Sequence, residues 1–199
     1  MAIHSISSKL YPHAFRMDTP HSSYILGIAA DGLAVHLYYG PKLSDTDMAS
    51  VCGEENSPWF PEPYAEMLLD HVPLEYSASG KEDLRPSALS VLWDDGDNIA
   101  DLRYRSHRIV TGKPSPKGLP HVYTEDDSEA QTLILALADA KGLEVDLYYT
   151  VLEHFDAVIR RTVIRNAGTQ NVSLLRVMSA SEDLPENRMD MISLNGSWA

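Results

Sequence analysis

The chain has 199 residues, is 44% hydrophobic and 23% charged, and carries a net charge of −13. This acidity disfavours nucleic acids and anionic membranes as partners, because both attract basic surfaces. No apolar run approaches the roughly 20 residues of a membrane helix. The single cysteine, Cys52, excludes an internal disulfide framework. Together with the lack of a secretory leader pattern, this predicts a cytoplasmic protein.

The first clear pattern along the chain is a β-hairpin. Residues 22–30 are apolar and β-prone, the Asp-Gly pair at 31–32 favours a type I′ turn, and residues 33–39 alternate. Side chains in a strand alternate between its two faces, so every second residue should share one face. In the returning strand these residues are Leu33, Val35, Leu37 and Tyr39.

Residues 44–73 have a different composition, rich in proline and interrupted by an acidic pair. This predicts a long excursion from the sheet, with a short helical turn at 64–70; long loops of this kind are commonly functional or mobile. Trp59 and Phe60 stand among prolines and would expose a large apolar surface unless another segment covers them. Sugars stack on aromatic rings and interfaces favour tryptophan, so the pair indicates a ligand or interface site, with packing onto its own sheet as the alternative.

From residue 88 onward the pattern is strand, turn, strand. We expect three hairpins, pairing 88–93 with 99–110, 131–139 with 143–152, and 157–165 with 172–179. Alternate residues of the fourth strand should face the core: Val145, Leu147, Tyr149 and Val151. Turn signals at this spacing predict an all-β fold, a large antiparallel β-sandwich that forms one domain over residues 1–199.

No catalytic, metal or cofactor site stands out. The eight histidines lack the spacing of known metal motifs, and the acidic run at 94–98 fits a hairpin turn better than a calcium loop. A retaining glycosidase needs two carboxylates about 5 Å apart. Among the 29 acidic residues, no pair has a context that singles it out. We therefore predict no catalytic residue, no metal and no cofactor.

Several short motifs follow one another in a fixed order. YYG ends the first hairpin at Gly40, EYSASGKEDLRPSA begins at Glu75, and GKPSPKGLPHVY begins at Gly112. RRTVIRN then ends at Asn166, and SLNGSWA ends at residue 199. In this order the motifs resemble the N-terminal domain of family 36 glycoside hydrolases, the microbial α-galactosidases. The second motif departs from the family at Leu84, where phenylalanine is usual, and its proline comes one position early.

The resemblance implies a supersandwich of the galactose mutarotase type that supports a catalytic (β/α)8 barrel. The enzymes of the family hydrolyse terminal α-galactosides, of melibiose or raffinose type, by a retaining mechanism. Their two catalytic aspartates lie in K-W-D and S-D-N-x-D segments of the barrel, and neither segment occurs in this chain. The resemblance thus implies a fragment that lacks its barrel, is inactive alone, and contributes to a homo-oligomer, a tetramer in the full-length parent.

By position, residues 54–63 correspond to a family loop that reaches a neighbouring subunit's sugar pocket. This makes Trp59 and Phe60, and then Arg85, the candidate contacts to α-galactoside substrates. Two other functions stay open. A stand-alone carbohydrate-binding sandwich would bind galactosides without turnover, and a mutarotase-like sugar epimerase would need a histidine and a glutamate in one concave site, with His107 or His121 as the histidine. A domain that rests on a barrel should also expose an apolar face when isolated.

Overall fold

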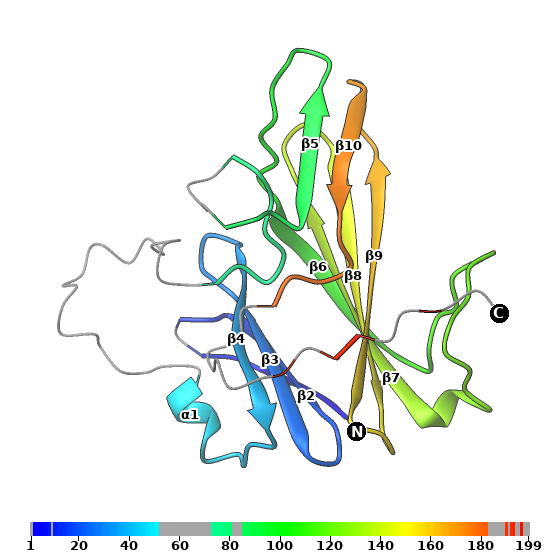
Figure 1. Cartoon of the computed structure of the whole chain (residues 1–199). Helices are drawn as coiled ribbons and strands as arrows, with labels where there is room; N and C mark the ends of the chain where they lie inside the picture. Colours follow the sequence, from blue (N-terminus) through cyan, green and yellow to red (C-terminus); the bar gives the residue numbers. More distant parts are fainter. Residues whose placement is uncertain are drawn as a thin grey trace.

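The computed structural model describes residues 2–8, 10–51, 73–80, 85–182, 190, 192–193 and 196. Within these residues the chain forms ten β-strands, one short α-helix and one 3₁₀ turn (Figure 1). In chain order the elements are β1 Ile3–Ile6, β2 His13–Asp18, β3 Ser22–Ile28, β4 Ala34–Pro41, α1 Met48–Val51, β5 Leu89–Trp93, β6 Arg103–Thr111, η1 Asp127–Glu129, β7 Ala130–Ala138, β8 Leu143–Leu152, β9 Ala157–Asn166 and β10 Val172–Val177.

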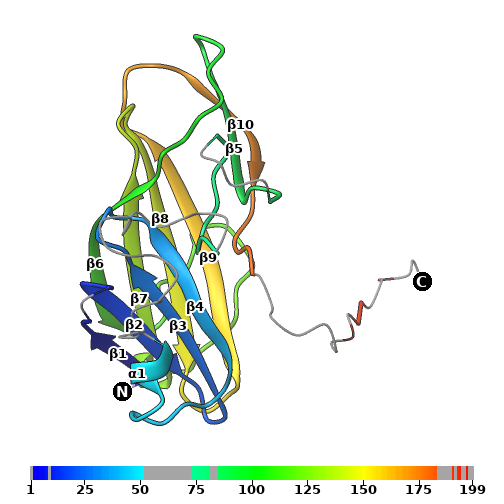
Figure 2. The same cartoon turned by 90° about the vertical axis from the view of Figure 1, so that its left-hand side faces the viewer.

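The strands form antiparallel sheets. One sheet has the order β1-β2-β3-β4, a second has the order β6-β7-β8-β9, and β5 pairs with β10 in a small third sheet. Figure 2 shows the two four-stranded sheets in separate layers, with the small sheet beyond one end of them. The predicted all-β antiparallel sandwich is therefore confirmed.

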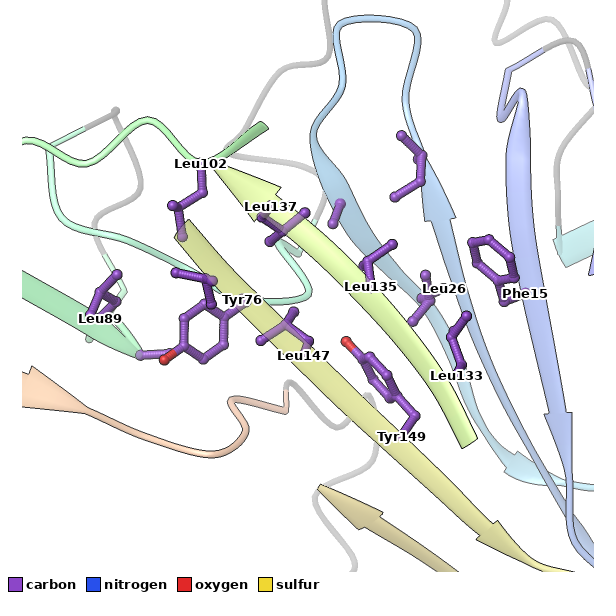
Figure 3. Close-up of a cluster of buried hydrophobic side chains, with 14 of the residues drawn as sticks. Phe15, Leu26, Tyr76, Leu89, Leu102, Leu133, Leu135, Leu137, Leu147 and Tyr149 are labelled. Atoms are coloured by element: carbon purple, nitrogen blue, oxygen red, sulfur yellow. The ribbon is translucent and has the colours of Figure 1, made fainter. Parts of the chain in front are cut away.

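The main core lies between the two large sheets. Phe15 and Leu26 of the first sheet approach Leu133 and Leu135 of β7 (Figure 3), and all four are fully buried. The alternate residues of β8 that were predicted to face the core are buried as well: Val145, Leu147, Tyr149 and Val151. Fully burying each such side chain stabilises the fold by roughly 1.5–3 kcal/mol. The apolar residues at every second position of β8 therefore both predict the strand and account for much of its stability.

A second apolar layer covers the outer face of the first sheet. Ile25 of β3 and Val35 of β4 point into it, and Tyr11 and Met48 pack over them. β3 is thus buried on both faces, which explains why its sequence is a continuous apolar run rather than an alternating one.

The first hairpin forms, but its turn is not the predicted type I′ turn on Asp31-Gly32, and the predicted face of its second strand is wrong at the end. The amide of Gly32 donates to the carbonyl of Ala29, so Ala30 and Asp31 are the central residues of the turn. Gly32 has a φ of +87°, a left-handed conformation that glycine adopts without steric cost. The register of β4 on β3 shifts between His36 and Tyr38, so Leu37 is an extra residue. Such a bulge changes the alternation. The outer layer therefore receives Tyr38, while the Tyr39 ring lies 5.4 Å from the ring of Tyr24, a core residue.

Of the three hairpins expected further along, only the pairing of β7 with β8 is confirmed. β5 pairs with β10, and β6 pairs with β7, in place of the expected β5–β6 and β9–β10 hairpins. After β5 the chain turns and crosses to the second large sheet, and Ala100 and Leu102 are buried on the way. Turn residues mark where a strand ends but do not fix which strand it pairs with, and this is why these two predictions were wrong.

The excursion after β4 begins with α1, and the residues predicted to form a helical turn, 64–70, lie outside the described residues. The chain then returns alongside β4. The amide of His36 donates to the carbonyl of Pro73 at 2.9 Å, and the amide of Glu75 donates to the carbonyl of Ala34 at 3.0 Å. This pairing places the side chain of Glu75 beside the edge of the sandwich. No helix among the described residues has the length and apolar character needed to cross a membrane.

Candidate functional site

Polar side chains from several separate segments meet at the edge of the sandwich formed by β4 and β9, the last strands of their sheets. They are Tyr24 of β3, His36 of β4, Glu75, Tyr149 of β8, Arg160 of β9 and Glu182. We call this set the Glu75 cluster. The local sequence explains the place of Arg160. It lies on the same face of β9 as Val158 and Ile164, which pack against the core.

Glu75 is the centre of the cluster and is fully buried. The hydroxyls of Tyr24 and Tyr149 each donate a hydrogen bond of 2.7 Å to its Oε1. Arg160 Nη2 lies 2.8 Å from the same oxygen, and His36 Nδ1 lies 3.3 Å from Oε2. A buried carboxylate is stable only when it is paired and hydrogen-bonded, and Glu75 meets both conditions.

Arg160 connects the two carboxylates of the cluster. Its guanidinium carbon lies 4.1 Å from the ring centroid of Tyr149, and Nη1 donates to the Tyr24 hydroxyl at 2.9 Å and contacts Glu182. Although Nη2 is within ion-pair distance of Glu75, its N–H groups do not point at that oxygen, and neither Nη2 nor Nε has a well-directed hydrogen bond within the described part of the chain. We therefore treat the Arg160–Glu75 contact as a charge interaction.

The charges in the cluster follow from burial and pairing. Burial alone would raise the pKa of Glu75, but the charge of Arg160 and the hydrogen bonds from His36 and Tyr24 outweigh it and hold this pKa below the ordinary 4.5. Burial opposes the charge on Arg160, but the surrounding Tyr149 and Glu75 raise its pKa further. Burial also raises the pKa of both tyrosines. Glu75 is consequently an anion, Arg160 is a cation, and the tyrosines are neutral donors.

Glu182, in the segment that follows β10, is the outermost member of the cluster. Its side chain is 25% exposed, and its Oε1 lies 2.9 Å from the hydroxyl of Tyr24. His36 Nδ1 is 3.6 Å from Oε2. Burial and then the charge of Glu75 raise the pKa of Glu182 above its ordinary 4.5. Of the two carboxyl groups, Glu182 is therefore the one that more readily holds a proton.

The two carboxyl groups are not arranged for glycoside hydrolysis. A retaining glycosidase holds its carboxylates on either side of a sugar ring. Here the Tyr24 hydroxyl lies within 3.0 Å of both carboxyl groups, and Glu75 has no exposed surface. The cluster therefore links strands of both large sheets to the segments that precede β5 and follow β10, and its central carboxylate, Glu75, is not accessible to a sugar.

The two histidines considered for an epimerase have other partners. The Tyr104 hydroxyl is 2.7 Å from His107 Nδ1, and the His107 ring lies 4.6 Å from the ring of Phe15. His121 is exposed, and its Nδ1 lies 3.1 Å from the carbonyl of Leu119. The histidine that meets glutamate is His36, within the closed cluster described above.

Of the three residues predicted to contact substrate, Arg85 lies among the described residues. Trp59 and Phe60 lie outside the described residues. Arg85 is half-buried in the segment that leads into β5. Whether these three side chains share a site stays a prediction.

His36 and Arg160 were missed as site residues. A signal for Arg160 was present, because a charged residue in the inward-facing series of a strand requires a buried acidic partner. The sequence alone cannot name that partner, since Glu75 and Glu182 lie far from Arg160 along the chain. His36 gave no signal, because its surroundings depend on the returning segment around Glu75.

A second feature is an exposed apolar surface on the small sheet. Its side chains are each at least 41% exposed and lie on β10 or directly after it: Leu174, Leu175, Val177 and Met178. We call it the β10 surface. Leu175 stands at a register shift between β10 and β5 and is 63% exposed. A run of exposed apolar side chains favours an interaction site in a soluble protein, so the β10 surface is a candidate interface.

The architecture is that of a β-supersandwich, and among the described residues no group of three or more acidic, histidine or cysteine side chains could hold a metal ion. Residues 32–199 match the glycosyl hydrolase family 36 N-terminal domain, and the chain belongs to this family.

Solved and curated relatives agree with this assignment. The chain is 36% identical over 188 residues to the α-galactosidase AgaA of Geobacillus stearothermophilus, covering 92% of this chain and 26% of the relative. It is 34% identical to the α-galactosidase Mel36A of Lactobacillus acidophilus, covering 93% and 26%. A crystal structure of AgaA in complex with raffinose superposes with a TM-score of 0.76 at 35% identity, over 86% of this chain and 24% of that one. The chain thus spans about a quarter of the length of these relatives.

Proposed function

We propose that the chain is the non-catalytic N-terminal domain of an α-galactosidase that hydrolyses terminal α-galactosides of the melibiose or raffinose type by a retaining mechanism. In this role it supports a catalytic barrel and contributes contacts to a homo-oligomer in the cytoplasm. The relatives are α-galactosidases of which this chain spans about a quarter, and one of them has been crystallised with raffinose. In the proposed enzyme the catalytic carboxylates belong to the barrel, and the buried Glu75 has a structural role.

The β10 surface is the observation that carries the supporting role. A small sheet whose outer strand presents leucine, valine and methionine to solvent is unfavourable in an isolated domain, because covering each such side chain contributes roughly 1.5–3 kcal/mol. In the proposed enzyme this surface is covered by the catalytic domain. β10, which carries most of these side chains, is held in place by its antiparallel pairing with β5.

The oligomeric role has a direct test. Light scattering coupled to size-exclusion chromatography should give four copies of the longer protein per particle. A variant that lacks residues 1–199 should form smaller particles or aggregate. A monomeric longer protein would remove the oligomer from the proposal while leaving the barrel-supporting role in place.

The proposed loop contact predicts a specific kinetic effect. In the longer protein, Trp59→Ala should raise KM for raffinose by about 2- to 12-fold, which corresponds to the 0.5–1.5 kcal/mol of a good aromatic contact. KM for a small aryl α-galactoside should stay unchanged, because that substrate does not extend to the loop. Phe155→Ala is the matched control, since Phe155 is an exposed aromatic residue between β8 and β9. Unchanged raffinose kinetics with unchanged assembly would show that Trp59 does not line the pocket.

A further inference from the structure

The Glu75 cluster contains more negative charge than its single permanent cation balances. Glu75 and Glu182 supply two carboxyl groups, and Arg160 supplies one positive charge. His36 adds a second only when it is protonated. The Tyr24 hydroxyl lies between both carboxyl groups but has one proton, so it donates to one of them at a time. One further proton makes the charges of the cluster balance.

Glu182 is the group best placed to take up that proton. It is part-exposed, while Glu75 is fully buried and receives hydrogen bonds from two tyrosines. The titratable and charged groups that face Glu182 come from β3, β4, the segment before β5, β8 and β9; they are Tyr24, His36, Glu75, Tyr149 and Arg160. Only Arg160 among them carries a permanent positive charge.

Among the described residues, the stretch from β10 to Glu182 makes few other hydrogen bonds after Val177. The amide of Met178 donates to the carbonyl of Ala88 at 2.9 Å, and the hydroxyl of Tyr76 donates to the carbonyl of Met178 at 2.9 Å. At Ser179 the hydroxyl of Thr162 makes a longer bond of 3.4 Å. Within the described part of the chain, the contacts of Glu182 with the cluster are therefore the main polar attachment of residues 180–182 to the sandwich edge.

We propose that Glu182 is a proton-controlled latch: when its carboxyl group is protonated, residues 180–182 are held against the β4–β9 edge, and when it is ionised they are released. In the closed form the neutral carboxyl group shares the Tyr24 hydroxyl and the Arg160 guanidinium with Glu75. In the open form the ionised carboxylate leaves, because it would otherwise face the buried Glu75 anion, and Arg160 stays paired with Glu75.

The direction of the pH dependence follows from the pKa of Glu182. This pKa is raised above 4.5 in the folded chain, mainly by burial and by the charge of Glu75. The latch therefore contributes its full stabilisation below pH 4.5 and loses it as the pH rises through the raised pKa. An acid-closed, base-open segment is the expected behaviour.

Backbone NMR relaxation of the 199-residue chain tests the latch. Between about pH 4 and 8, the order parameters of the amides at 180–182 should fall from roughly 0.85 to below about 0.6, with a midpoint equal to that of the Glu182 side-chain carboxyl resonance. Glu182→Gln resembles the protonated form and should keep the segment ordered at every pH. Glu182→Ala should leave it mobile at every pH.

Glu153→Gln is the matched control, because Glu153 is an exposed residue between β8 and β9, and it should follow the unmodified chain. Order parameters that do not change with pH would overturn the proposal, as would an unchanged transition in Glu182→Gln. A transition that survives Glu182→Gln and disappears in His36→Asn would assign the switch to the histidine and would also overturn it.

Discussion

Replacing Arg160 by methionine should lower the free energy of unfolding of the chain by about 3–5 kcal/mol, the effect expected when one member of a buried ion pair is removed. The change leaves the fully buried Glu75 without its permanent countercharge and removes the cation stacked on Tyr149. Urea unfolding followed by circular dichroism measures the difference.

Two comparisons separate this effect from general damage to β9. Arg165 lies on the same strand and pairs with Glu144 and Asp146, but its side chain is 50% exposed. Arg165→Met should therefore cost less than about 1 kcal/mol. The double variant Glu75→Gln with Arg160→Met should recover more than half of the loss, because no buried charge then remains unpaired. A cost below about 1 kcal/mol for Arg160→Met, or no recovery in the double variant, would show that the pair does not stabilise the fold.

Replacing Leu175 by aspartate should hardly change the stability of the isolated chain but should strongly reduce the activity of the longer protein. In the isolated chain Leu175 is 63% exposed, so the change should alter stability by less than about 0.5 kcal/mol. In the longer protein the same side chain is expected to be buried against the catalytic domain. There the loss of roughly 1.5–3 kcal/mol of burial, with the added cost of a buried charge, should reduce α-galactosidase activity at least about 10-fold.

Ser173→Asp is the control for the second prediction. It introduces the same charge on the same strand at an exposed polar position outside the apolar set. It should leave the melting temperature unchanged in both forms and the α-galactosidase activity of the longer protein unchanged. Equal behaviour of Leu175→Asp and Ser173→Asp in the longer protein would mean that the β10 surface is not where the catalytic domain rests.

Local patterns predicted two of the strand pairings, β3 with β4 and β7 with β8, but neither the rest of the large sheets nor the small sheet. The alternation in β8 depends on neighbouring residues and appears as predicted; the hairpin at the Asp-Gly pair also forms, with its turn centred one residue earlier than predicted. The pairing of β5 with β10 depends on how the whole chain folds back, which no local pattern reports. The extra residue at Leu37 is similar: a bulge is a property of two strands together, and it moved Tyr39 off its predicted face.

The same contrast, between local sequence patterns and contacts that depend on the whole fold, explains what could be predicted of the site. Glu75 belongs to a motif that supported the family resemblance, yet its role is set by Tyr24, Tyr149 and Arg160, which come from three different strands. That the chain holds no catalytic pair stays a prediction. The predicted contacts at Trp59 and Phe60 lie outside the described residues and depend on the kinetic test above.

The central claim, that this chain is one domain of a larger α-galactosidase, has one direct measurement. Lysate of the organism that encodes the chain is separated on a native gel and a denaturing gel. The gels are probed with an antibody to residues 1–199 and stained with a fluorogenic α-galactoside. The antibody should detect a polypeptide about four times the 22.1 kDa of this chain, and the fluorescent band of the native gel should coincide with it. Antibody reaction only at 22.1 kDa, with no fluorescence at that position, would contradict the account.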